Sequence, residues 1–188
     1  MNHRTFIEFL GLIEKLKCYT RHSWTSSGRR ESIAEHSHRL AVMAMLCRDE
    51  FPDLDVNKVI KMCLIHDFGE AITGDIPAFL KTAEHEDAEN TAIQQLLAAL
   101  PEAQSAELSA LFTEMKELST DEARLYKALD NIETLISHNE ADLSTWLPRE
   151  YSDNLVYGDE NCAWSDWIRG LRDAVRQDSI SKIESERK

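Results

Sequence analysis

The sequence contains no apolar run approaching the roughly 20 residues that a membrane-spanning helix requires. The N-terminal segment MNHRTFIEFLGLIEKLK also lacks the uninterrupted apolar stretch and the small-residue cleavage site of a secretory signal peptide. From these two absences we expect a cytoplasmic protein without a membrane partner.

Cysteine is scarce and widely spaced. The four cysteines, Cys18, Cys47, Cys63 and Cys162, include no CxxC pair. The sequence therefore indicates neither a thiolate zinc site nor a disulfide scaffold. Cys47 and Cys63 lie in apolar segments of helical periodicity, where a cysteine usually serves as a small buried hydrophobic residue.

Basic residues are also few. The chain has 21 Lys and Arg against 34 Asp and Glu, which gives a formal net charge of −13. Proteins that bind nucleic acids usually present a basic face, so this balance argues against a nucleic-acid partner. It still allows a small phosphorylated substrate, because a metal ion and one or two local basic residues can reverse the potential inside a pocket.

Glycine and proline are rare (Gly 6, Pro 4), and no run alternates with period two for long enough to predict a strand. We predict a compact all-α fold, with residues 1–178 as one domain and residues 179–188 as a charged tail that frays. Residues 18–31 are expected to form a loop, and Ser119 with Glu122 a capping box. The expected helices cover residues 4–17, 32–51, 56–71, 84–99, 102–117, 120–139 and 161–177.

The most informative feature of the chain is the pair His66-Asp67, which ends the apolar run VIKMCLIHD. Burying two titratable residues without partners would cost several kcal/mol. His36 lies on the apolar stripe of the helix expected over 32–51. Asp130 lies beside the apolar stripe of the helix expected over 120–139. A core-facing histidine alone is usually structural, but one metal ion would satisfy all of these side chains together.

Two imidazoles and two carboxylates form a ligand set that suits Mn, Co, Fe, Ni or Zn rather than Ca, with Mg also possible. Glu70 follows His66 by one helical turn and is expected to face the same pocket. Asp75 follows on the turn at Gly74. Taken alone, each of these two acids is equally consistent with a solvated surface residue and with a functional one. Beside a metal site, one becomes a candidate general acid or base and the other a group that positions water.

The same residues carry a resemblance to a known family. The order H…HD…D and the acid spacing HDxxExxxxGD resemble the HD-domain metal-dependent phosphohydrolase superfamily, and in particular its YfbR-like 5'-deoxynucleotidase branch. That resemblance implies an all-helical HD-domain fold and a homodimer. It also implies metal binding by His36, His66, Asp67 and Asp130. The segments that carry it are ESIAEHS, LIHDFGEAITGDIP and STDEARLYKALDNIE.

The resemblance also implies that Glu70 and Asp75 act on the attacking water and the leaving group. In that family an arginine before the first histidine contacts the substrate phosphate. Here that arginine is Arg21, in the segment Arg21-His22-Ser23-Trp24. A guanidinium can hold a phosphate through two parallel hydrogen bonds, and the Trp24 indole can stack on a base. A surface ion pair for Arg21 and a core role for Trp24 are the alternatives, and Lys81 is a further phosphate candidate.

We expect a single metal ion, because His85 alone stands as an extra histidine between the HD pair and Asp130. The favoured function is release of phosphate from a deoxynucleoside 5'-monophosphate. A dNTP triphosphohydrolase would need further basic residues near the pocket, for which Arg29, Arg30 and Lys81 are the candidates. A non-catalytic module that senses nucleotide or metal would be indicated by the loss of one acid, and both acids are present.

Overall fold

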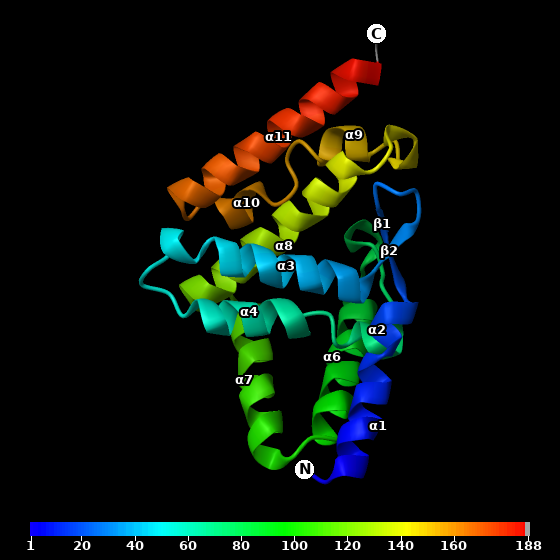
Figure 1. The fold of residues 1–188 in the computed structure, drawn as a ribbon, viewed down its shortest axis with the longest axis vertical. Helices are drawn as coiled ribbons and strands as arrows, with labels where there is room; N and C mark the ends of the chain where they lie inside the picture. The colour runs from blue at the N-terminus through cyan, green and yellow to red at the C-terminus, as the bar shows by residue number, and fades with distance from the viewer. Residues whose placement is uncertain (187–188) are drawn as a thin grey trace.

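Helices dominate the computed structural model, which describes residues 1–186 (Figure 1). The expected all-α class is confirmed. The helices are α1 His3–Ile13, α2 Lys15–Cys18, α3 Ile33–Leu46, α4 Val56–Ile65, α5 Glu70–Thr73, α6 Ala83–Ala98, α7 Glu102–Glu117, α8 Asp121–Glu140, α9 Glu150–Asp153, α10 Asp159–Cys162 and α11 Asp166–Glu186. Short 3-10 turns lie at η1 Arg48–Glu50, η2 Ala78–Leu80 and η3 Leu143–Thr145.

The central layer consists of α3, α4 and α8, with α11 packed on the outer side of α8 (Figure 1). Their apolar stripes meet in one core, where each fully buried aliphatic side chain contributes roughly 1.5–3 kcal/mol. Helices α6 and α7 form a pair that extends away from this layer (Figure 1). Fully buried members of the core are Leu40, Met62, Leu125, Leu129, Ile132, Leu135 and Ile168.

A β-hairpin covers residues 20–32, although the sequence predicts only a loop over residues 18–31. Strand β1 (Thr20–Trp24) pairs antiparallel with β2 (Arg30–Ser32), and Gly28 takes a left-handed conformation (φ 80°) in the connection. The hairpin buries polar residues, including Ser23 and Glu31. The hairpin sequence shows no alternation of apolar and polar residues, because the inner side of the hairpin faces polar partners on α8.

Two predicted helices end earlier than expected. The segment expected over 56–71 stops at Ile65, and a turn through Gly69 precedes α5. A Cβ at Gly69 would stand 2.6 Å from Cγ of Glu89, so α6 approaches the chain too closely there for a larger residue. The helix expected over 32–51 ends at Leu46 and continues as the turn η1.

The start of α8 also differs by one residue from the expected capping box. Thr120, and not Ser119, is the N-cap, and its hydroxyl accepts a hydrogen bond from the Ala123 amide at 3.2 Å. Either hydroxyl residue can cap a helix, so the spacing alone did not decide between them.

Helix α11 continues through most of the segment expected as a tail. Ser179 and Ile183 are buried one and two turns beyond Val175, and the Ser179 hydroxyl donates to Asn139 Oδ1 at 2.8 Å. Residues 187–188 of that expected tail lie outside the described residues. The four cysteines are free thiols, and Cys47 and Cys63 are buried as predicted. Within residues 1–186, none of the helices combines the length and the apolar character needed to cross a bilayer.

Candidate metal centre and substrate pocket

The structure brings the four candidate metal ligands together from three parts of the chain. His36 lies on α3, His66 and Asp67 lie in the turn after α4, and Asp130 lies on α8. Nε2 of His36 is 3.2 Å from Nε2 of His66 and 3.2 Å from Oδ1 of Asp130. Nε2 of His66 is 2.9 Å from Oδ2 of Asp67. The donor atoms of His36, His66 and Asp67 lie within 4.8 Å of one another, and Oδ1 of Asp130 lies beside the two histidine nitrogens, 3.8 Å from Nε2 of His66.

The hydrogen bonds behind the histidines direct their free nitrogens toward this group of donor atoms. Nδ1 of His66 lies 2.9 Å from the Cys63 carbonyl, which can only accept, so Nδ1 carries the ring proton. In the neutral ring Nε2 then presents a lone pair to the Asp67 carboxylate. Two facing acceptors need a proton or a metal cation between them. The donor set of two imidazoles and two carboxylates thus fits one divalent transition ion.

The charges around the cluster lead to the same conclusion. Burial raises the pKa of Asp67, but the neighbouring His66 outweighs it, and the pKa falls to about 2. Burial lowers the pKa of His36, yet hydrogen bonds to Asp130 and Glu133 raise it to about 9. The cluster therefore holds a proton when no cation is bound, and a metal ion would replace that proton.

Glu133 is a central residue of the site that the sequence analysis missed. It is fully buried (0% exposed) and its Oε2 accepts a hydrogen bond from Nδ1 of His36. Its Oε1 accepts from Nε of Arg39 at 2.6 Å, and Nη1 of Arg21 lies 3.4 Å from Oε2. Glu133 follows Asp130 by three residues on α8, so helical spacing was the signal that could have found it.

We expect the substitution Glu133→Gln to weaken metal binding by about 10- to 100-fold, the usual cost of losing a carboxylate behind a metal-binding histidine. The amide keeps the shape of the side chain but removes the charge that orients His36. Calorimetric titration with Co²⁺ would measure the affinity. Glu140→Gln is the matched control, since Glu140 also pairs with Arg39 but is exposed. Equal affinities in both variants would contradict this role.

Glu70 and Asp75 stand next to the cluster as a second acidic pair. Glu70 is only 4% exposed, and its Oε2 has no hydrogen-bond partner among the described residues. Burial, with the nearby charges of Asp67 and Asp75, raises the pKa of Glu70 to about 10. Burial also raises the pKa of Asp75. A buried carboxyl oxygen without a partner is suited to bind a reacting water or a leaving group.

The three candidate substrate contacts take different positions. Arg21 donates from Nη2 to the Thr134 hydroxyl at 3.1 Å and lines a cavity of about 380 Å³ together with Asp75. Nζ of Lys81 lies 2.5 Å from Oε2 of Glu89. The positive charge of Lys81 also lowers the pKa of nearby Glu70, against the larger effect of burial. Trp24 does not line the cavity. Arg30, its cross-strand partner, covers the indole at 4.5 Å.

A second cavity, of about 650 Å³, reaches the cluster from the side of His66. Lys127 lies in its wall, and its Nζ is 2.8 Å from Oδ2 of Asp130. The sequence analysis did not single out Lys127, although it precedes Asp130 by one helical turn. Both cavities lie in the size range of small-ligand sites, roughly 300–1,000 Å³. Of the four candidate metal ligands, His66 lines the larger cavity and none lines the smaller one.

A helical fold that gathers two histidines, two aspartates and an adjacent acid pair defines a metal-dependent hydrolase. The family model described as "HD domain" matches residues 13–169. The chain therefore belongs to the HD-domain family of metal-dependent phosphohydrolases.

Individual relatives agree with this assignment. The chain is 35% identical over 141 residues to the human protein named 5'-deoxynucleotidase HDDC2, covering 73% of this chain and 68% of that one. It is 30% identical over 172 residues to 5'-deoxynucleotidase hdd1 of Schizosaccharomyces pombe, covering 82% and 86%. A solved structure titled a predicted metal-dependent phosphohydrolase, from Magnetospirillum magnetotacticum, superposes with a TM-score of 0.81 at 30% identity, over 95% and 93% of the two chains.

Proposed function

We propose that this protein is a 5'-deoxynucleotidase that releases orthophosphate from deoxynucleoside 5'-monophosphates. One observation carries the proposal: Arg21 and Asp75 line the 380 Å³ cavity, and both lie close enough to the metal cluster to interact electrostatically with Asp67. The site therefore combines a guanidinium that can bind an anion, a metal cluster that can activate water and a carboxyl that can transfer a proton. The names of the human and yeast relatives support the same substrate class.

In this proposal His36, His66, Asp67 and Asp130 hold one divalent transition ion, which polarises a phosphoryl oxygen and acidifies water when bound. Arg21 binds the phosphate. One carboxyl of the Glu70 and Asp75 pair accepts a proton from the attacking water, and the other donates a proton to the leaving 5'-oxygen. The two transfers balance, so the products are orthophosphate and a neutral nucleoside hydroxyl.

The basic residues near the cavity favour a monophosphate over a triphosphate. Arg29 is paired with Glu35 at 2.6 Å, Lys81 is paired with Glu89, and Arg30 stacks on Trp24. None of the three cations that the sequence offered for additional phosphates lines the 380 Å³ cavity, whereas Arg21 does. A phosphate-release screen of nucleoside mono-, di- and triphosphates with Mn²⁺, Co²⁺ and Mg²⁺ tests the proposal. Release of intact triphosphate from a dNTP, without activity on monophosphates, would contradict it.

The finer assignments complete the proposal: a cytoplasmic homodimer that acts on small nucleotides. Helix α1 supports the dimer, because none of its residues is buried and Phe6, Ile7 and Leu10 are each about half exposed. Such an apolar face is suited to a second copy of the chain. A sedimentation mass of one chain, 21.5 kDa, would contradict the dimer.

Removing the guanidinium in Arg21→Ala should lower kcat/KM for a deoxynucleoside monophosphate at least about tenfold. The lost contact to phosphate is worth roughly 1.5–3 kcal/mol, and each 1.4 kcal/mol is a factor of ten. Arg21→Lys should recover only part of the activity, because an ammonium cannot form the two-pronged contact. Steady-state kinetics over a range of substrate concentrations would measure both.

Arg39→Ala is the control for this experiment, because Arg39 also pairs with Glu133 but is absent from the cavity wall. Arg39→Ala should change the affinity for the metal more than it changes recognition of the substrate phosphate. If Arg21→Ala keeps the parent's kinetics, the phosphate role passes to Lys81 or to the metal.

A further inference from the structure

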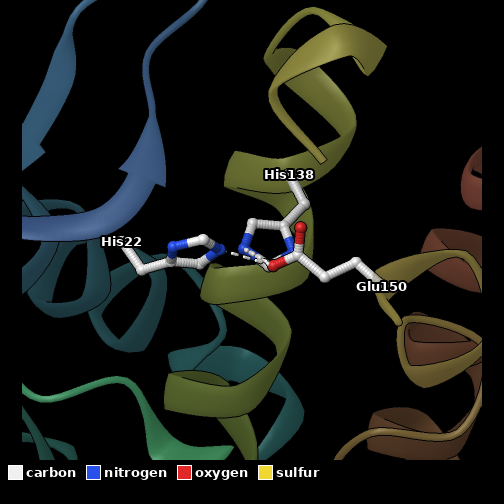
Figure 2. Close-up of side chains that lie close together, drawn as sticks. All are labelled: His22, His138 and Glu150. Carbon is white, nitrogen blue, oxygen red and sulfur yellow. Dashed lines mark hydrogen bonds and ion pairs between the residues drawn. The ribbon is translucent and has the colours of Figure 1, made fainter. Parts of the chain in front are cut away.

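A second group of ligand-type side chains lies in the wall of the 380 Å³ cavity, away from the four-residue cluster (Figure 2). His22 comes from β1, His138 from α8 and Glu150 from α9. Each offers one ligand atom, and these atoms all lie within 4.8 Å of one another. We propose that His22, His138 and Glu150 form a second metal site, for a divalent transition ion such as Zn²⁺ or Co²⁺.

The surroundings of His138 point its free nitrogen into the group. Its Nδ1 lies 3.0 Å from Oδ1 of Asn154, which only accepts, so Nδ1 carries the proton of the neutral ring. Nε2 then presents a lone pair to Oε1 of Glu150 at 3.6 Å, too far for a hydrogen bond. A histidine held by its second nitrogen in this way is the usual arrangement behind a metal ligand.

Glu150 is fixed so that one oxygen remains for an ion. It is buried, and its Oε2 accepts a hydrogen bond from the Leu147 amide at 2.6 Å. Its Oε1 therefore faces the two histidines, as Figure 2 shows. A buried carboxylate needs a positive partner, and an ion between Oε1 and the two Nε2 atoms would supply it.

His22 completes the group from the hairpin. Its Nε2 lies 2.8 Å from Oε1 of Glu150, and Nη1 of Arg30 lies 3.5 Å from its Nδ1. Without an ion, this favours a proton on Nε2, which is donated to Glu150. Metal binding requires that proton to move to Nδ1 and the exposed Arg30 to turn away.

The ligand type and the position define what this site would bind. Two imidazoles and one carboxylate hold zinc, cobalt or iron while leaving coordination positions open. Those positions face the cavity that also contains Arg21 and Asp75. A metal ion here would bind a ligand atom of a molecule in the cavity, at the end remote from the four-residue cluster. The proposal does not depend on the proposed nucleotidase function.

Metal stoichiometry of the full chain tests the proposal. Equilibrium dialysis against Co²⁺ or Zn²⁺ should show that His22→Gln and Glu150→Gln each bind one equivalent less than the parent. The visible Co²⁺ spectrum should lose one component in both. In an Asp67→Ala background the His22-dependent equivalent should persist, which separates this site from the four-residue cluster. His38→Gln, an exposed histidine on α3, is the matched control and should change nothing.

Thermal melting and circular dichroism would verify that the variants fold. His22 is partly exposed while Glu150 is buried, so His22→Gln decides the question if Glu150→Gln does not fold. A folded His22→Gln protein with the same metal stoichiometry and the same Co²⁺ spectrum as the parent overturns the second site.

Discussion

Asp67→Ala should remove one equivalent of bound metal and reduce phosphate release by about a thousandfold or more. The substitution deletes an anionic oxygen 2.9 Å from Nε2 of His66 and leaves two histidines and one aspartate to hold the ion. A catalytic metal contributes several kcal/mol to a phosphoryl-transfer barrier, and each 1.4 kcal/mol is a factor of ten in rate. Metal analysis of the purified protein and a phosphate-release assay would measure the two effects.

Asp53→Ala serves as the control for Asp67→Ala, since Asp53 is an exposed aspartate in the loop before α4. Stabilisation by added metal gives an independent measurement. An ion at 100 times its Kd stabilises the native state by about 2.7 kcal/mol, and Asp67→Ala should lose most of that gain. The four-residue site is wrong if the purified Asp67→Ala protein holds as much metal as the parent.

Glu70→Gln should lower kcat by roughly 10²- to 10⁴-fold, the range that positioned acid or base groups contribute. The amide preserves the shape of the buried side chain but cannot exchange a proton. Metal content and KM should change little, because Glu70 is not one of the four proposed ligands. Glu84→Gln, at an exposed position on α6, is the control. Near-normal turnover would leave Asp75 as the remaining proton-transfer candidate.

The same substitution should raise the thermal stability of the metal-free protein at pH 8. Burial and neighbouring acids raise the pKa of Glu70 to about 10, above its ordinary value of 4.5. The folded state therefore binds more protons than the unfolded state between these values, and stability falls as pH rises through that window. Glutamine removes this dependence. A variant that is less active yet more stable would separate a catalytic role from a structural one.

The sequence predicted most helices and the convergence of His36, His66, Asp67 and Asp130, and the structure explains why. Those residues interrupt apolar stripes, so their burial required a shared partner. For Glu133, the helical spacing after the candidate ligand Asp130 was the one available signal, and its contact with His36 also depends on the orientation of α3 across α8. That orientation is a tertiary property which periodicity does not encode.

The hairpin and the second histidine group were missed for a related reason. The hairpin buries Ser23 and Glu31 against polar partners, so the usual alternation of apolar and polar residues is missing. His22, on β1, lies more than a hundred positions before His138 and Glu150, which come from α8 and α9. No local spacing relates them, and only the packing of β1 against α8 brings them into one wall.

The hairpin also constrains how this chain can tolerate insertions and deletions. Arg21 and His22 are consecutive in β1, yet Arg21 contacts Glu133 and Thr134 while His22 contacts Glu150. The pairing of β1 with β2 is irregular between Thr20 and Trp24, and a shift of one residue there would take both side chains away from their partners. Length changes in the connection at residues 25–29 leave both in place. A single deletion just before Arg21 would instead place His22 at the proposed phosphate position and Ser23 opposite Glu150, so that one lost codon would disable both the anion contact and the histidine contact.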